Sequence, residues 1–360
     1  MKLIKYTPAI LLSFLGIMAC QKLFIAPDEV ANQPVRNFEL FWNDVDKTYP
    51  FFKEDNIDWQ SYYDKYRPLV NEKTQTEALF GIFIRMMQPL MDGHRSLSYQ
   101  DLAWSEPPKY SPRSKYNFDF ISSEYLTSVN VTTQPDEFDP EEQDTVLITA
   151  MAKNNQFAYI GLRSYNTEIE LNRSVEEFLS ANSSVNNLII DLRRNGGGFL
   201  FQMFQLMRLF ARTKVPYATY VPKVGPLKNH LFPREKYEGE DFIIPSDIKV
   251  PSDGRFSNKR IVFITNRVCY SAAEHTVLVA KQLGFPVVGD STGGALSIVM
   301  EKTLPNGINY VLVNSKTLDI NGRLWERIGV PPTHYVKATQ DDFKNGDPFF
   351  EKAIQLLGNN

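Results

Sequence analysis

The spacing of hydrophobic and polar residues changes along the chain, and its first part has the spacing of amphipathic helices. Apolar side chains recur there at intervals of three and four residues: Phe38, Phe41, Trp42 and Val45. This period places them on one face of a helix. Residues 58–70 and 74–87 show the same period. Asp58 and Thr74 stand where a polar side chain caps a helix N-terminus. The pattern predicts a small N-terminal helical domain over residues 36–100.

A β-rich segment follows in residues 101–150. Short runs of Tyr, Phe, Val, Ile and Thr are broken there by an acidic, proline-containing stretch at residues 135–144. This composition is typical of strands or a hairpin, with the acidic stretch as an exposed turn. We interpret the segment as a connection between the helical domain and what comes after it.

Strands and helices alternate from residue 151 to residue 360. The predicted strands cover 157–162, 187–192, 260–265 and 286–288, and the predicted helices cover 174–181, 199–212 and 271–283. The strands are continuously apolar, as in Leu188-Ile189-Ile190, which indicates a parallel sheet covered by helices on both faces. The predicted fold class is therefore α/β, and active groups in such sheets lie at the carboxyl ends of the strands.

The N-terminus has the features of an export signal. Two lysines precede an uncharged, mostly apolar stretch at residues 6–19, which is shorter than the roughly 20 apolar residues of a membrane span. A cysteine directly after a small residue resembles the lipobox of bacterial lipoproteins. Residues 1–19 are thus predicted to be a lipoprotein signal peptide, Cys20 to carry the lipid, and residues 20–35 to form a tether. An ordinary cleaved signal with an incidental cysteine is the alternative.

Composition narrows the possible partners. There are 39 Lys and Arg residues against 42 Asp and Glu, a formal charge of -3, so no basic field favours nucleic acid. The two cysteines are Cys20 and Cys269, and with Cys20 lipidated the other thiol has no internal disulfide partner. Membrane contact is expected through the lipid anchor only, in the bacterial cell envelope, facing either the periplasm or the cell surface.

A glycine-rich turn follows the strand predicted at 187–192. Gly196-Gly197-Gly198 lie between that strand and a helix, where positive φ angles and outward N–H groups can form an anion or oxyanion site. A phosphate-binding loop would need a following Lys and Ser or Thr, whereas Phe199-Leu200-Phe201 follow here. Nucleotide binding is therefore disfavoured.

A serine stands at a second strand end. The apolar strand at 260–265 runs into a short turn and then into Ser271-Ala272-Ala273-Glu274, the start of a helix. This position exposes the hydroxyl, and the helix dipole favours negative charge that forms beside it. The alternative is that Ser271 only caps the helix.

Several motifs, taken in their order along the chain, resemble those of the tail-specific, or C-terminal processing, serine peptidases. They are Asp92-Gly93-His94, Asp191-Leu192-Arg193, Asn195-Gly196-Gly197-Gly198, Ser271-Ala272-Ala273-Glu274, Gly289-Asp290-Ser291-Thr292-Gly293-Gly294, Gly329-Val330-Pro331-Pro332 and Gly346-Asp347-Pro348. The set covers nearly all of the mature chain. The resemblance implies a core related to the crotonase and ClpP folds over residues 151–360, with Ser271 as the nucleophile.

The family divides by its general base. One branch has a lysine after the nucleophile in a Thr-x-Gly-Lys-Gly segment, and the matching residues 292–296 here contain no lysine. The other branch includes the tricorn peptidase core and uses a histidine and a late glutamate. The resemblance implies His94 as the base, because a neutral imidazole can accept the serine proton, and Glu326 as the third group. An ordinary surface ion pair with Arg323 or Arg327 is the alternative for Glu326.

Two backbone N–H groups, those of Gly197 and Ala272, are expected to form the oxyanion hole, where negative charge develops on the carbonyl oxygen. Glu274 matches the glutamate of the family motif, and its expected role is structural, in the first turn of the helix. His275 follows Ser271 by four residues on the same helical face and is therefore a rival base.

The remaining sequence gives no sign of a metal or organic cofactor. His230 and His334 stand in loop-like sequence, and no spacing of His, Glu, Asp or Cys predicts a metal site. Many family members carry a PDZ domain after the histidine motif, but the interval between His94 and Phe157 is too short for a complete one.

These observations predict a serine-type peptidase that hydrolyses peptide bonds in extended or C-terminal segments of peptides or unfolded proteins. An extended peptide could pair with an edge strand in the cleft. One alternative is a non-catalytic peptide- or ligand-binding lipoprotein on the same fold. Another is acyl transfer or hydration on a crotonase-like core, which would need a coenzyme A site.

Overall fold

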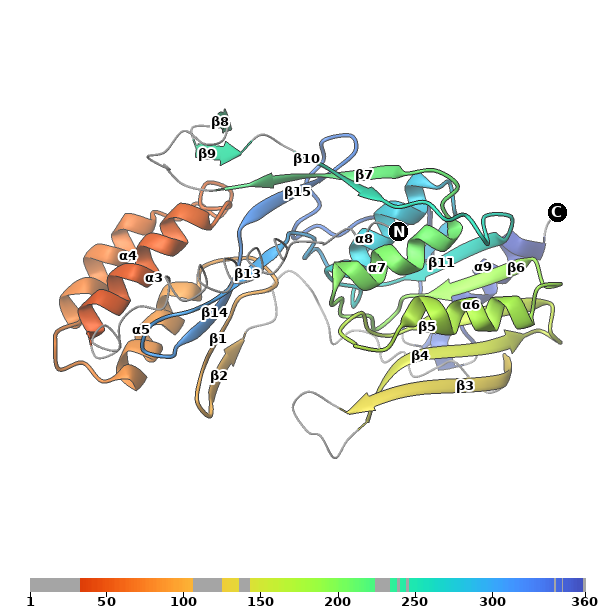
Figure 1. Ribbon diagram of the computed structural model, residues 1–360, viewed down its shortest axis with the longest axis horizontal. Coiled ribbons are helices and arrows are strands. Elements are labelled where there is room, and N and C mark those ends of the chain that lie inside the picture. Colours follow the sequence, from red (N-terminus) through yellow and green to blue (C-terminus); the bar gives the residue numbers. More distant parts are fainter. Residues whose placement is uncertain are drawn as a thin grey trace, which may run out of the picture.

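The protein consists of two lobes joined by a small sheet, as Figure 1 shows. This computed structural model describes residues 33–105, 125–135, 143–223, 234–237, 240–243, 246–339, 341–344 and 346–358. The N-terminal helices lie at the left of Figure 1 and the largest sheet at the right. The predicted signal peptide, Cys20, most of the predicted tether, His230 and the acidic turn at 136–142 lie outside the described residues.

Three helices form the N-terminal lobe, as the apolar period predicted. They are α3 (Pro34–Thr48), α4 (Trp59–Tyr66), which runs into the 3-10 turn Arg67–Leu69, and α5 (Thr76–Met87). On α3 the buried face includes Phe38, Phe41 and Val45. Removing each such side chain from water contributes about 1.5–3 kcal/mol to stability, so this face fixes the helix against its neighbours.

The predicted helix caps have different outcomes. Asp58 caps α4, because its Oδ1 accepts the N–H of Ser61 at 3.3 Å. Thr74 does not cap α5: its hydroxyl accepts the N–H of Asn71, and the helix starts later, after Gln75. The prediction for Thr74 was wrong because a turn before the helix uses the hydroxyl first.

A four-stranded antiparallel sheet completes the N-terminal lobe. Its order is β13-β14-β1-β2, with β1 (Ser96–Tyr99), β2 (Leu102–Ser105), β13 (Val299–Thr303) and β14 (Asn309–Val313). Phe41 of α3 stacks on Phe83 with 4.0 Å between ring centroids and meets the edge of Tyr310 at 5.2 Å. Residues 299–313, late in the chain, therefore build part of the core of the N-terminal helices.

The largest sheet has seven strands in the order β16-β12-β11-β6-β5-β4-β3. Their bounds are β3 (Leu126–Pro135), β4 (Gln143–Ala152), β5 (Phe157–Leu162), β6 (Asn187–Asp191), β11 (Arg260–Thr265), β12 (Val287–Gly289) and β16 (His334–Tyr335). The strands from β16 to β5 pair in parallel, and β4 and β3 are antiparallel. The hairpin predicted within 101–150 is thus β3–β4, and it extends this sheet.

Helices cover both faces of the seven-stranded sheet. One face carries α6 (Leu171–Ala181), α7 (Leu200–Met207) and α8 (Ala272–Gln282), and the other carries α9 (Pro348–Gly358). On β6, Leu188 and Ile190 belong to the first core and Ile189 to the second. This alternation with burial on both sides explains the continuous apolar runs of the sequence. The predicted α/β fold with a small N-terminal helical region is confirmed.

A three-stranded sheet of order β10-β7-β15 lies between the lobes in Figure 1. Its strands are β7 (Val215–Pro222), β10 (Ser246–Val250) and β15 (Ser315–Asp319), and a separate hairpin is formed by β8 (Arg234–Tyr237) and β9 (Glu240–Ile243). Short 3-10 turns cover Arg208–Phe210 and Asp342–Lys344. None of the helices in the described ranges combines the length and the apolar character that crossing a membrane requires.

Candidate active site

Ser271 lies where β11 passes through a short turn into α8. Its φ is 50° and its ψ is -121°, a conformation that costs a non-glycine residue on the order of 1–3 kcal/mol. Its N–H donates to Ala295 O and to Glu274 Oε2, both at 3.1 Å. Ser271 does occupy the N-cap position of α8, and its side chain is half-buried rather than enclosed. A serine in a strained conformation at the start of a helix is compatible with a nucleophile.

The glycine turn after β6 lies directly against Ser271. A Cβ atom added to Gly197 would come within 2.7 Å of Ser271 Cβ and 3.1 Å of Ala272 N, and the φ of Gly197 is 98°. Only glycine fits here, both for space and for conformation. The N–H of Gly197 donates to Asn195 Oδ1 at 2.8 Å. The two strand ends therefore meet as predicted, and the oxyanion hole formed by Gly197 and Ala272 stays a prediction.

Glu274 fixes the loop that surrounds Ser271. Its side chain is fully buried and accepts four hydrogen bonds, from Thr292 Oγ1 at 2.5 Å, Gly294 N at 2.8 Å, Ala295 N at 2.7 Å and Ser271 N at 3.1 Å. Burial raises the pKa of Glu274 to about 7, against these four donors, which favour the ionised form. The contacts give Glu274 the structural role expected from the sequence.

Glu326 is buried, with 3% of its surface exposed, and is not part of a surface ion pair. Its Oε2 accepts the N–H of Ser297 at 2.8 Å, and the neighbouring Arg327 pairs with Asp55 instead. Burial is the largest of the causes that raise the pKa of Glu326 to about 8, and the charges of Glu274 and Asp92 act in the same direction. Asp55 links the segment of Glu326 to that of His94, because its Oδ2 accepts the N–H of Met91 at 3.3 Å and its carboxylate forms an ion pair with Arg327.

His94 lies in the loop before β1 and is half-buried. Its main-chain N–H donates to Asp92 Oδ1 at 2.9 Å, which closes a tight turn, and Arg95 Nη1 donates to Asp92 O at 2.8 Å. Burial raises the pKa of Asp92 to about 6. The structure thus brings the His94 segment towards Glu326, whereas the contact of the imidazole with Ser271 stays a prediction.

His275, the rival base, is part of the core. It is 2% exposed, its Nδ1 lies 2.9 Å from Tyr217 Oη and its Nε2 lies 2.9 Å from Leu296 O. A carbonyl oxygen only accepts, so Nε2 carries the proton and Nδ1 accepts from the tyrosine hydroxyl. Burial lowers the pKa of His275 to about 4. Both ring nitrogens are engaged away from Ser271, which leaves a structural role.

Cys269 and His334 also have structural surroundings. The buried Cys269 thiol donates to Leu192 O at 3.0 Å, and burial raises its pKa to about 12, so it is not a thiolate at neutral pH. His334 belongs to β16 at the sheet edge, where its Nδ1 lies 2.9 Å from Thr333 Oγ1. Within the described part of the chain, no cluster of three or more His, Cys, Asp or Glu side chains is placed to hold a metal ion.

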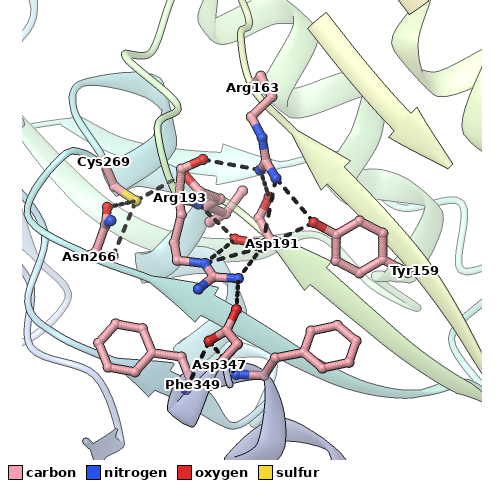
Figure 2. A network of polar contacts seen from close by, with 10 residues as sticks. Tyr159, Arg163, Asp191, Arg193, Asn266, Cys269, Asp347 and Phe349 are labelled. Atoms are coloured by element: carbon pink, nitrogen blue, oxygen red, sulfur yellow. Dashed lines mark hydrogen bonds and ion pairs between the residues drawn. The ribbon is translucent and has the colours of Figure 1, made fainter. Parts of the chain in front are cut away.

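A buried charge network joins the end of β6 to the start of α9, as Figure 2 shows. Arg193 Nη2 lies 2.7 Å from Asp191 Oδ2 and 2.7 Å from Asp347 Oδ2, and all three residues are at most 3% exposed. Burial opposes ionisation of Asp191, but Arg193 and Arg163 bring its pKa below the usual value. Asp347 Oδ1 also accepts the N–H groups of Phe349 and Phe350 at the start of α9. Two of the motifs quoted from the sequence are therefore one structural unit.

Sequence reasoning missed the polar groups that surround the predicted triad. These include Ser297, whose N–H reaches Glu326, and the pair formed by Asp55 and Arg327. Arg327 was noted only as a neighbour of Glu326 in the sequence. Nothing in the sequence marks Asp55, because its partners Met91 and Arg327 lie 36 or more residues away along the chain.

Comparisons with known proteins identify the family. The chain matches the family model for peptidase family S41 over residues 156–336 and that for the tricorn protease C1 domain over residues 32–88. Among curated proteins, none matches this chain.

Several solved structures share the fold. A candidate peptidase from Parabacteroides merdae is 24% identical, with 90% of this chain and 96% of that chain covered and a TM-score of 0.65. The tricorn protease is 15% identical, with 92% and 36% covered and a TM-score of 0.52. The photosystem II D1 C-terminal processing protease is 12% identical, with 84% and 93% covered and a TM-score of 0.51.

Proposed function

The chain belongs to peptidase family S41 and is a serine peptidase, and from this premise we propose that Ser271 is its nucleophile, His94 its general base and Glu326 the third catalytic group. The observation that carries the proposal is the conformation of Ser271. Ser271 has a strained backbone conformation and stands at the start of α8. It lies so close to the glycine turn that a Cβ atom on Gly197 would clash with it. Such strain is found where a side chain must be presented to a substrate.

The proposed reaction gives each of these groups one step. The imidazole of His94 takes the proton of the Ser271 hydroxyl as the oxygen attacks the peptide carbonyl, and returns it to the leaving amine. The N–H groups of Ala272 and of the glycine turn stabilise the oxyanion, and the N-terminal dipole of α8 acts in the same direction. Gly197 would have to share its N–H with Asn195 Oδ1 to serve as the second donor.

In this proposal Glu326 responds to the charge on the imidazole. Because burial raises its pKa to about 8, a proton is held there at neutral pH in the unliganded protein. An imidazolium formed beside it during the reaction would favour loss of that proton. We expect peptidase activity to rise with pH as Glu326 becomes ionised.

The proposal extends to substrate and location. The substrates are extended segments of peptides or unfolded proteins, the core is of the crotonase and ClpP type, and recognition does not use a complete PDZ domain. Cleavage after Ala19 and lipidation of Cys20 would hold the enzyme at the bacterial cell envelope. Support for the last point comes from the sequence of residues 1–20 only.

Labelling with a fluorophosphonate probe tests the nucleophile. The wild-type protein should be labelled and Ser271→Ala should not. Labelling of His94→Gln should be slower by roughly 10²-fold or more, because a positioned base contributes about 10²–10⁴-fold to the rate. Ser257→Ala is a matched control, because this serine lies away from the site, beside Arg212, and should leave labelling unchanged. Labelling that persists in folded Ser271→Ala would show that another residue is the nucleophile.

A further inference from the structure

The turn between α3 and α4, residues 49–55, is held by basic side chains that come from the later half of the chain. The contacts are Lys223 Nζ to Tyr49 O at 2.9 Å, Lys316 Nζ to Glu54 Oε1 at 2.7 Å, and an ion pair of Arg327 with Asp55. Two of these cations also lie over the ring of Phe51, with Arg327 5.0 Å and Lys316 6.0 Å from its centroid. These contacts tie the turn to the three-stranded sheet through Lys223 and Lys316, and to the loop beside Ser271 through Arg327.

Asp55 differs from the other residues of the turn because its carboxylate is shared between two segments. Its side chain is fully buried, and its Oδ2 accepts the hydroxyl of Tyr49 at 2.6 Å and the N–H of Met91 at 3.3 Å. The Tyr49 hydroxyl in turn lies 3.2 Å from the same Met91 N. Met91 directly precedes the Asp92-Gly93-His94 turn, so these bonds fix the start of the segment that carries His94.

The other oxygen of Asp55 holds the segment that carries Glu326. Arg327 follows Glu326 in the chain and has a φ of 67°, which an arginine rarely adopts. Its N–H donates to Gly294 O at 2.6 Å, in the loop whose Ala295 carbonyl accepts from Ser271 N. A change in Arg327 would therefore reach both Glu326 and the loop beside Ser271.

We propose that Asp55, in the N-terminal lobe, is a positioning residue. It aligns His94 of the same lobe with Glu326 of the other lobe. The inference rests on the proposed function, since it concerns the alignment of that triad. Asp55 accepts the backbone N–H of Met91, just before the His94 segment, and pairs with the side chain of Arg327, just after Glu326. Its carboxylate therefore sets the distance between these two segments. Misplacement of a catalytic group by about 1 Å costs roughly 10²-fold in rate. In this role Asp55 acts through the two segments and does not contact the substrate.

The test compares Asp55→Asn with Glu54→Gln in the full chain. Both variants remove one carboxylate from the same turn and one ion pair with the later half of the chain, but Glu54 contacts neither Met91 nor Arg327 in the described structure. With fluorescein-labelled casein as the probe, Asp55→Asn should lower kcat by roughly 10–100-fold with KM changed less than about threefold. Glu54→Gln should keep kcat within about twofold. The rate of fluorophosphonate labelling should follow kcat.

Tyr49→Phe is a milder variant if Asp55→Asn does not fold. It removes one hydroxyl donor from Asp55 and leaves the pair with Arg327, and it should lower kcat by about threefold to tenfold at unchanged KM. Equal kcat values in folded Asp55→Asn, Tyr49→Phe and Glu54→Gln would overturn the positioning role. In that case the proposed function survives as long as the wild type is labelled and Ser271→Ala is not. Absence of wild-type labelling would instead remove the proposed function and the positioning role together.

Discussion

Two arginines in this protein are each held by buried aspartates, and they connect very different regions. Arg193 lies within one lobe, between Asp191 at the end of β6 and Asp347 at the start of α9. Arg327 reaches from the loop beside Ser271 to Asp55 in the other lobe. The first network joins elements that the seven-stranded sheet already holds together. The second joins two lobes whose relative position is not fixed by that sheet.

The difference indicates what each network contributes. A buried arginine between two carboxylates of the same core supports the fold, because loss of the cation leaves two charges without compensation. An ion pair across lobes contributes less to the core, but it sets the distance between segments that must meet for catalysis. Substitutions in the first network should therefore act on stability, and those in the second on rate.

Arg193→Met should have the largest effect on stability. It leaves Asp191 and Asp347 buried without their main partner, and this should lower the free energy of unfolding by about 3–5 kcal/mol. Urea denaturation followed by circular dichroism measures the loss. Arg173→Met is the control, because Arg173 forms an exposed pair with Glu177, and its denaturation midpoint should not change. A stable Arg193→Met protein would show that the buried network does not hold the fold.

Glu326→Gln should separate rate from stability. The amide still accepts from Ser297 N but carries no charge, so activity should fall roughly 10²–10⁴-fold. The pKa of Glu326 is raised from 4.5 to about 8 on folding, so wild-type stability from this group falls as pH rises through that window. The variant lacks this loss, so above pH 8 its free energy of unfolding should exceed that of the wild type by on the order of 2–4 kcal/mol. Denaturation at pH 5 and pH 8.5 checks the sign, and a variant with less stability at pH 8.5 would contradict it.

His275→Leu tests whether the histidine nearest to Ser271 in sequence belongs to the core alone. Tyr217 Oη and Leu296 O would lose their partner, which should cost about 1–3 kcal/mol in the free energy of unfolding. The kcat of the folded variant should stay within about twofold of wild type, measured below its melting temperature. Loss of activity in a folded His275→Leu protein would identify His275, and not His94, as the base.

Asp58→Ala should have the smallest effect. The cap of α4 contributes about 0.5–2 kcal/mol, and the helix lies just after the turn that contains Asp55. Thermal denaturation should show this small loss, whereas kcat should not change, because the contacts of Asp55 do not involve the cap. A fall in kcat comparable to that of Asp55→Asn would mean that any loosening of the N-terminal lobe disturbs the site.

Much of the fold could be predicted from local patterns. The three N-terminal helices, the hairpin β3–β4 and the alternating strands and helices of the core all follow from the periods of apolar residues. Strands β7, β13, β14 and β15 were not predicted. β14 pairs with β1 and β15 pairs with β7, both far away in the sequence, and β14 packs on helices that precede it by more than 200 residues, so the burial of these strands is not visible as a local period.

The sequence by itself determined the family motifs, the helix that begins after Ser271 and the glycine turn, because short-range sterics and capping fix such features within a few residues. Only the tertiary structure decided that Glu326 is buried, that His275 is occupied and that Asp55 joins the two lobes. Burial and ion pairing depend on which distant segments pack together. That information lies in the whole set of contacts and not in the neighbours of any one residue.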